Sequence, residues 1–261
     1  LKLKEKVINV KTNKSILFLD KNFIKLESID VNLDLIKLFK GTTLIKNIRI
    51  DTDQNSIKDI TNFINLYKFD LQRFLVFNQI NDGLIKANAN VYFGKENKDI
   101  LRYEIKGKIR DVKISLLNQK NVSKIDLNFD IKNKEYNFND ISLYYEGIKY
   151  QSKKININNN GKNFKINGDL RNEKGLIKPN LISGLLQFNF DFLEEKEISV
   201  ETENEFSFLI NSKRKIKDIS LKSKIIFDEI FINQKYQDLI FLKNGTVETE
   251  FSNNDLKVNI N

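Results

Sequence analysis

The strongest constraint on this chain is the alternation of apolar and polar residues, which runs through most of residues 98–261. Ile125–Ile131 and Leu186–Phe192 alternate without interruption, and residues 163–167 repeat the pattern over a shorter stretch. A period of two places successive side chains on opposite faces of a β-sheet. Repeated along the chain, it predicts a broad sheet with one apolar face and one face of Lys, Asn, Asp and Glu.

Turn-forming residues separate the strands and indicate how they connect. Asn, Asp and Gly cluster at residues 81–83, 158–161 and 252–255, and these residue types favour turns. Short connections of this kind favour antiparallel neighbours, and therefore a meander.

The sequence pattern also indicates where strands end and where glycines recur within them. The alternation breaks between residues 101–109 and 112–116, and again between 219–227 and 229–232, so separate strands are expected there. A strand–glycine–strand theme also recurs without a fixed period. Its glycines are Gly107, Gly168 and Gly245.

Two short helices are expected in the N-terminal part. Leu35–Phe39 is followed by Gly41, which predicts one helical turn with a glycine stop. Residues 56–67 predict a longer helix, because Ser56 and Asp59 form a capping-box-like pair. Apolar residues of this segment then share one helix face, namely Ile57, Ile60, Phe63, Ile64 and Tyr67.

The composition removes most of the usual catalytic groups. The chain has no Cys, His, Met or Trp, so it lacks thiolate chemistry and the commonest general base and metal ligand. Glu194, Glu195 and Glu197 form a charge run in an expected turn, and Ser220 with Lys222 has a spacing that chance gives in a Lys-rich chain. We therefore expect a non-enzymatic protein with no metal and no cofactor.

The net charge of +9, from 44 basic and 35 acidic residues, would suit a nucleic acid, an anionic lipid or an acidic partner. The lysines, however, are dispersed on the polar strand faces with Asp and Glu between them. The densest cluster, Lys213–Lys215 with Lys217, is interpreted as a charged turn. Nucleic-acid-binding proteins gather charge in a stripe with stacking aromatics, whereas here the aromatics lie on the opposite face. No nucleic-acid partner is expected.

The longest apolar runs are four residues, as in Ile16–Leu19, whereas a membrane-spanning helix needs about 20. The chain begins at Leu1, so we expect a segment of a longer protein whose membrane anchor lies upstream. Pro179 is the only proline and lies in a turn-rich stretch at 171–184. The expected organisation is a first region at 1–175 and its continuation at 176–261, or a single domain.

What covers the apolar face decides the function. A sandwich or barrel would pack this face against itself as a closed core. Two features favour an open face: the strands continue without the long crossovers of a Greek key, and bulky Phe and Ile dominate. The predicted fold is mostly β, a long twisted antiparallel sheet curled into an open apolar groove. Since soluble proteins rarely expose so large an apolar patch, the acyl chain of a lipid is the expected occupant.

Residues 23–41 and 44–50 resemble the N-terminal region of AsmA-like envelope proteins, a family that includes TamB and YhdP. The shared pattern is an alternating strand, a short Leu-rich turn ending in Gly, and a second strand. The helix at 56–67 and the strand–Asn–Gly–strand unit at 77–85 continue the resemblance, and Tyr103–Val112 is similar to the YhdP branch. The second half of the chain is similar in style only.

This resemblance implies a periplasmic β-groove segment, anchored to the inner membrane and passively conducting phospholipids toward the outer membrane. An outer-membrane partner protein is a further expectation, and the family supplies no catalytic residues. Two alternatives stay open: a structural or adhesive β-sandwich or solenoid module, and a hydrolase on a β scaffold. The residues expected to line the lipid groove are Ile105, Ile109, Leu127, Phe129, Ile131, Phe164, Ile166, Phe188, Phe190, Phe192, Phe206 and Phe208.

Overall fold

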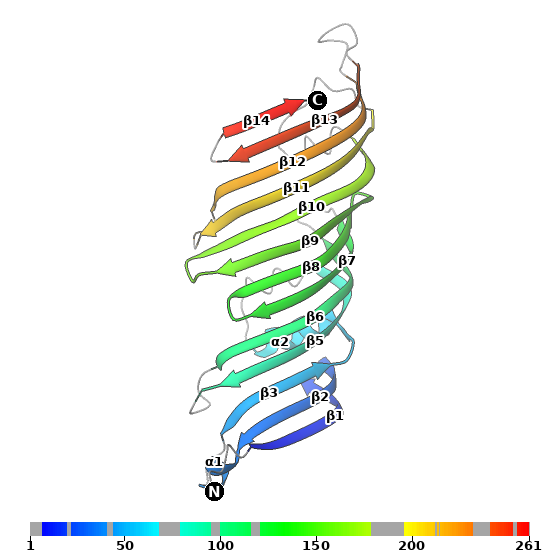
Figure 1. The fold of residues 1–261 in the computed structure, drawn as a ribbon. Coiled ribbons are helices and arrows are strands. Elements are labelled where there is room, and N and C mark those ends of the chain that lie inside the picture. Colours follow the sequence, from blue (N-terminus) through cyan, green and yellow to red (C-terminus); the bar gives the residue numbers. More distant parts are fainter. Residues whose placement is uncertain are drawn as a thin grey trace. The chain divides into compact units, whose positions relative to one another are not determined.

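The computed structural model describes residues 7–19, 22–40, 44–67, 79–94, 100–115, 121–178, 196–211, 213, 215–231, 241–252 and 255–260. These residues form two short helices and a succession of long strands (Figure 1). The helices are α1 (Leu35–Phe39) and α2 (Ile57–Tyr67). The strands are β1 (Val7–Leu19), β2 (Asn22–Asp34), β3 (Ile45–Thr52), β4 (Asn55–Ser56), β5 (Ile80–Phe93), β6 (Ile100–Ser115), β7 (Asn121–Lys132), β8 (Glu135–Tyr145), β9 (Ile148–Asn159), β10 (Asn163–Ile177), β11 (Ile198–Asn211), β12 (Ile216–Phe231), β13 (Phe241–Ser252) and β14 (Asp255–Ile260).

The described strands belong to one antiparallel sheet. They pair in the order β1-β2-β3-β5 and then β6 through β14, while β4 pairs with β5 beside this path. The path begins at β1 and ends at β14, and within the described residues it does not close into a barrel. The predicted fold class, a long open antiparallel sheet with two short helices, is confirmed.

Contacts divide the chain into a first unit, Leu1–Ile141, and a second unit, Ser142–Asn261. The boundary expected from the sequence near residue 176 falls at the end of β10. Residues 179–195, which follow it, lie outside the described residues. That boundary therefore stays a prediction.

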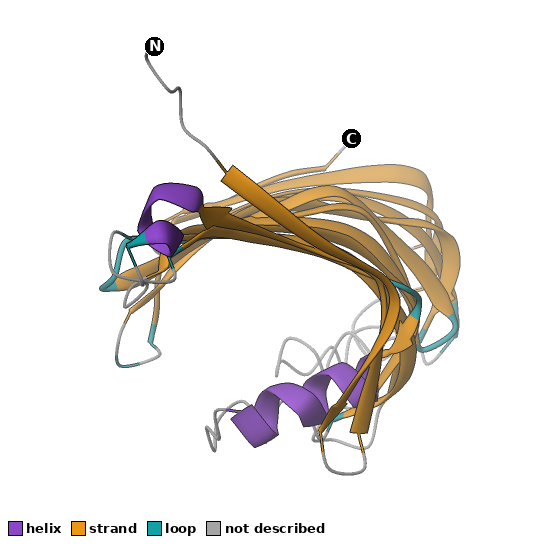
Figure 2. Ribbon diagram, turned by 90° about the horizontal axis from the view of Figure 1, so that it is seen from below, coloured by secondary structure: helices purple, strands orange, loops and turns teal. Residues whose placement is uncertain are grey.

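In the first unit, α2 covers part of the apolar face of the sheet. The helix contacts β2, β4 and β5 and lies on the inner side of the curved strands (Figure 2). Ile57 at its start is buried, as are Ile24 and Leu26 of β2. The inner side of this unit is therefore the apolar side.

Two polar side chains position α2, and both lie at its N-terminal end. Asn55 is buried and accepts a hydrogen bond from the Lys25 N–H (2.7 Å) while donating one to the Lys25 carbonyl (3.0 Å). The Ser56 hydroxyl oxygen accepts a hydrogen bond from the Lys58 N–H (3.2 Å), as expected for a capping residue. Asn55 thus joins the start of the helix to β2.

The strands expected as separate pieces are continuous, so these two sequence predictions were wrong. Residues 101–109 and 112–116 fall largely in β6, and 219–227 and 229–231 belong to β12. In β6 the interruption is a β-bulge, since Ile109 pairs with Leu127 and Val112 with Ile125 while Asp111 has a φ of 53°. A bulge adds one residue to a strand, so Ile109 and Val112 keep the same face three positions apart.

The recurring glycines each lie opposite a phenylalanine on the next strand. Their cross-strand partners are Phe129 for Gly107, Phe206 for Gly168 and Phe227 for Gly245. A β-carbon added at Gly107 or Gly245 would collide with the ring of its partner, and one added at Gly168 would lie 3.1 Å from the Phe206 ring and 2.9 Å from atoms of Lys154 and Ile155. Each phenylalanine ring therefore packs against a glycine, which gives the strand–glycine–strand theme its structural reason.

Candidate functional site

The apolar face of the first unit consists of rows that cross several strands. In one row Ile29 pairs with Ile50, Ile50 with Ala89, Ala89 with Ile105 and Ile105 with Ile131. Directly opposed residues on neighbouring strands share a face. The isoleucines of this row are half-buried, so each still presents apolar surface on the inner side.

In the second unit the apolar face has two parts. At one end of the strands, Ile198, Val200 and Phe227 form a buried cluster. At the other end, Phe164 pairs with Ile210 and Ile166 with Phe208. The rings of Phe206 and Phe208 there are stacked with their centroids 6.1 Å apart. We call this second part the phenylalanine strip; it consists of Phe164, Ile166, Phe206, Phe208 and Ile210.

Nine of the twelve residues expected to line a groove are described, and the structure places them in two groups. Phe188, Phe190 and Phe192 lie outside the described residues. In the first unit the registers join Ile105 to Ile131 and Ile109 to Leu127, with Phe129 over Gly107. In the second unit the described members belong to the phenylalanine strip. A role for these residues in lipid binding stays a prediction.

The predicted residues differ in how much surface they offer. Phe129 is only 7% exposed and forms part of the wall of the sheet, whereas Phe164 is 39% exposed. The remaining seven are half-buried. Phe164 and Phe208 therefore offer a ligand more apolar surface than Phe129 does.

Sequence reasoning missed a row of polar residues that crosses the apolar face of the second unit. We call it the polar belt, and it consists of Asn172, Thr202, Asn204 and Ser223. The Thr202 hydroxyl donates to the Asn172 side-chain oxygen, and the Asn204 amide donates to the Thr202 hydroxyl oxygen (2.9 Å). Ser223 donates to the side-chain oxygen of Asn204 (2.7 Å). The belt separates the buried cluster from the phenylalanine strip.

The belt had a weak signal in the sequence. In β11, every second residue from Ile198 to Ile210 faces the apolar side, and Thr202 and Asn204 occupy two of these positions. Thr202 and Asn204 could have been noticed as polar residues within this apolar series. The hydrogen bonds that satisfy them, however, join β10, β11 and β12. Those bonds follow only from the register.

Among the described residues, no second sheet lies over the strands, and α2 contacts β2, β4 and β5 on the inner side of the first unit. Within the same residues, no large side chain is completely buried. The apolar face of the described strands is therefore only partly covered.

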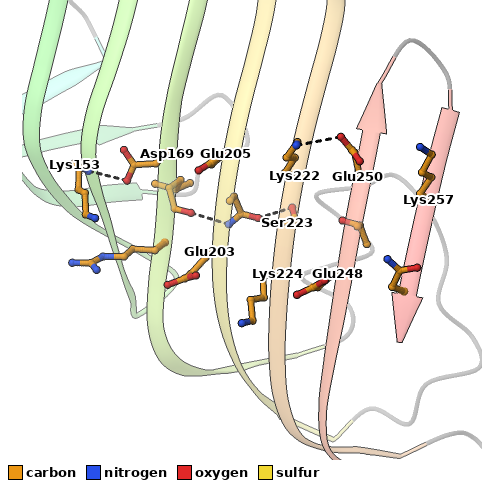
Figure 3. Close-up of a pocket in the computed structure, with 15 residues that line it drawn as sticks. Lys153, Asp169, Glu203, Glu205, Lys222, Ser223, Lys224, Glu248, Glu250 and Lys257 are labelled. Atoms are coloured by element: carbon orange, nitrogen blue, oxygen red, sulfur yellow. Dashed lines mark hydrogen bonds and ion pairs between the residues drawn. The ribbon is translucent and has the colours of Figure 1, made fainter. Parts of the chain in front are cut away.

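The opposite face of the second unit carries a ladder of charges. Two neighbouring rows run across β10–β14, and Figure 3 shows their side chains around an open hollow of about 660 Å³. One row contains Arg171, Glu203, Lys224 and Glu248; the other contains Asp169, Glu205, Lys222, Glu250 and Lys257.

One cross-strand ion pair of the charge ladder joins β12 to β13. Lys222 and Glu250 form an ion pair of 3.3 Å with both side chains about half exposed, and opposite charges directly across a strand pair are stabilising. At one end of the ladder, Asp169 accepts hydrogen bonds from the Lys153 and Lys154 N–H groups (2.9 and 3.0 Å). We interpret this hollow as the space between paired surface side chains.

On the polar face of the first unit, hydrogen bonds join β2, β3 and β5. The Asp51 carboxylate accepts from Asn88, from Ser28 (3.0 Å) and from Arg49 (3.1 Å). Partial burial raises the pKa of Asp51, but these hydrogen bonds outweigh it and hold the pKa below its ordinary value. The ionised carboxylate is thus part of the fold in this region.

No group of three or more His, Cys, Asp or Glu side chains that could hold a metal ion occurs among the described residues. Within the same residues, no helix has the length and apolar character needed to cross a membrane.

Comparison with known protein families, with curated proteins and with solved structures finds no match for this chain. The resemblance to AsmA-like envelope proteins therefore stays a prediction from its sequence motifs.

Proposed function

We propose that this chain binds phospholipid acyl chains on its open apolar face and conducts them passively, without catalysing a reaction. The observation that carries the proposal is the combination of an apolar face built from half-buried Ile and Phe side chains with the absence of a second layer over the described strands. Burying such surface is favourable by about 25 cal/mol per Å², so an apolar occupant stabilises it.

The cellular setting belongs to the same proposal. The motifs at residues 23–50 and 77–85 resemble AsmA-like proteins, so we place the chain in the periplasm, as a segment of a protein anchored to the inner membrane. Phospholipids would move toward the outer membrane, where a partner protein would receive them. In this proposal, the acyl chains lie on the apolar face while the head groups stay in water.

The test is mass spectrometry of organic extracts from protein purified without detergent, beside a β-sandwich protein prepared in the same way. We expect about one phospholipid or more per chain. Protein free of lipid would contradict the proposal and favour a structural or adhesive module instead.

A pair of variants on β11 makes the test specific to the apolar face. Phe208 lies on that face, whereas the adjacent Ser207 lies on the other. Phe208→Asp should lower the retained lipid severalfold, whereas Ser207→Asp should leave it unchanged. If Phe208→Asp fails to fold by circular dichroism, Phe164→Asp replaces it, because that side chain is 39% exposed. Equal retention in all folded variants would place the lipid elsewhere.

A further inference from the structure

Exposed lysines gather at one end of strands β9–β12 in the second unit. The turn between β9 and β10 and the turn between β11 and β12 lie side by side there, because Asn163 at the start of β10 pairs with Asn211 at the end of β11. We call this group the basic rim. Its members are Lys162, Lys165, Lys213, Lys215 and Lys217, all exposed.

Lysines outnumber acidic residues at the basic rim. No Asp or Glu occurs in residues 147–168 or 206–217, and the exposed Asp218 follows Lys217 directly. Among the described residues, no carboxylate forms an ion pair with any lysine of the rim. The recorded ion pairs of this unit, such as Lys222–Glu250, involve residues farther along the strands. Charge is therefore segregated toward one end of these strands.

Asparagine side chains hold both turns of the rim. The Asn211 side-chain oxygen accepts hydrogen bonds from the N–H groups of Lys213 (3.0 Å) and Lys215 (2.9 Å). The Asn160 side-chain oxygen accepts from the N–H groups of Lys162 (3.0 Å) and Asn163 (2.8 Å). The backbone that carries these lysines is thus ordered before any ligand arrives, which lowers the entropy lost on binding.

The phenylalanine strip begins at the basic rim and ends at the polar belt. In β11 it extends from Ile210, next to the rim, to Phe206, and the belt residue Asn204 follows. The five residues from Phe206 to Ile210 span about 16 Å, and the hydrocarbon of one bilayer leaflet is about 15 Å thick, half of a 30 Å core. The strip therefore has the length of one acyl chain.

We infer that the second unit binds an anionic phospholipid in a fixed direction, with its phosphate head group at the basic rim and its acyl chain along the phenylalanine strip toward the polar belt. This inference rests on the proposed function and adds the charge and the orientation of the lipid. Lys162, Lys213 and Lys215, which lie in the two turns, supply ammonium groups to the phosphate, whereas Lys165 and Lys217 pair with Leu209 on the other face of the strands. The side chains of the polar belt hydrogen-bond one another. The belt is therefore a polar boundary at which the methyl end of the acyl chain stops.

The experiment uses the full chain and vesicles that contain equal amounts of dioleoylphosphatidylglycerol and dioleoylphosphatidylcholine. The protein is incubated with the vesicles and separated from them, and the bound lipids are extracted and quantified. At low salt we expect the anionic lipid to be enriched about fivefold or more, and the enrichment to fall as salt is raised.

Two triple variants with the same change in charge test whether the basic rim causes the enrichment of the anionic lipid. Lys162→Gln, Lys213→Gln and Lys215→Gln together should bring the two lipids to equal amounts without reducing total lipid. Lys153→Gln, Lys154→Gln and Lys224→Gln, which lie along the strands away from the rim, should keep the enrichment.

Each contrary outcome has a distinct meaning. Lipid bound without enrichment, or an equal effect of both triple variants, would overturn the inference while leaving the proposed function intact. Binding of neither lipid would overturn both. Glycerophosphate without acyl chains, tested separately, should bind far more weakly; equal affinity would show a site for free phosphate rather than for a lipid.

Discussion

The close packing of phenylalanine rings on glycines can be tested most cleanly at Gly245. The three atoms nearest to a β-carbon built on Gly245 all belong to the Phe227 ring, including Cε1 at 2.8 Å and Cε2 at 2.9 Å. Phe227 is 3% exposed and packs with Ile198 and Val200, so its ring has little room to move. The φ of Gly245 is not in the left-handed region, so alanine can adopt the backbone there.

Two opposing effects set the magnitude for Gly245→Ala. Overpacking of a core costs about 1–3 kcal/mol, and replacing glycine by alanine within a strand recovers about 0.5–1 kcal/mol. We therefore expect the free energy of unfolding to fall by about 0.5–2 kcal/mol. Gly175→Ala is the matched control, because its added β-carbon meets Ile148 at 3.3 Å and should change stability much less.

A double-mutant cycle, measured by urea unfolding with circular dichroism, separates the two effects. In a Phe227→Leu background the ring is gone, so Gly245→Ala should become stabilising by about 0.5–1 kcal/mol. The same destabilisation in both backgrounds would refute the argument, because the cost would then not come from the ring. A stabilising Gly245→Ala in the original chain would refute it as well.

Three further perturbations test the polar features. Thr202→Val leaves the Asn172 side-chain oxygen without its donor and should lower the free energy of unfolding by about 1–3 kcal/mol. The control Thr249→Val, on the same face of β13, should have little effect. Equal urea midpoints for the two variants would contradict a structural role for the polar belt. The pKa of Asp51 is lowered in the fold, so its stabilisation is present above the ordinary Asp pKa of about 3.9 and is lost as pH falls through the lowered value. Unfolding measured between pH 6 and pH 2 should therefore depend less on pH in Asp51→Asn, and parallel curves would count against the network. Lys222→Gln removes an exposed ion pair and should change the unfolding free energy by less than about 1 kcal/mol, so a larger loss in urea titration would mean that the charge ladder acts cooperatively.

The sequence predicted the class of the fold because its main signal is local. Alternation in residues such as Ile125–Ile131 requires only that each strand have one apolar face, and the sheet obeys it. Both helices were also predicted from local signals. Ser56 caps α2 as expected, whereas Gly41, the expected stop of α1, lies outside the described residues, and Asp34, which accepts from the Lys37 N–H (3.1 Å), caps α1 without having been predicted. Signals that depend on one segment could be recognised before any pairing was known.

The features that were missed depend on pairing between strands. The bulge at Asp111 looks like a strand end in the sequence, because it breaks the period of two, yet the ladder continues on both sides of it. Likewise, Gly107 reads as a weak point until its neighbour Phe129 is known. The polar belt is visible only when Asn172 and Thr202 are seen to be opposite one another. Register is not encoded in any single segment, so these features could not be predicted.

An open sheet must obtain its stability without a second layer, and the two faces of this one contribute differently. The polar face contributes exposed ion pairs such as Lys106–Asp130 at 3.3 Å, each of which adds little. On the apolar face, rings packed against glycines bury carbon atoms within the sheet itself. Part of the apolar face of the described strands still stays exposed, and an acyl chain bound there would cover it as a second layer. Since a ligand that binds only the folded state stabilises it by about 2.7 kcal/mol at one hundred times its dissociation constant, lipid occupancy and stability are coupled in the proposed function.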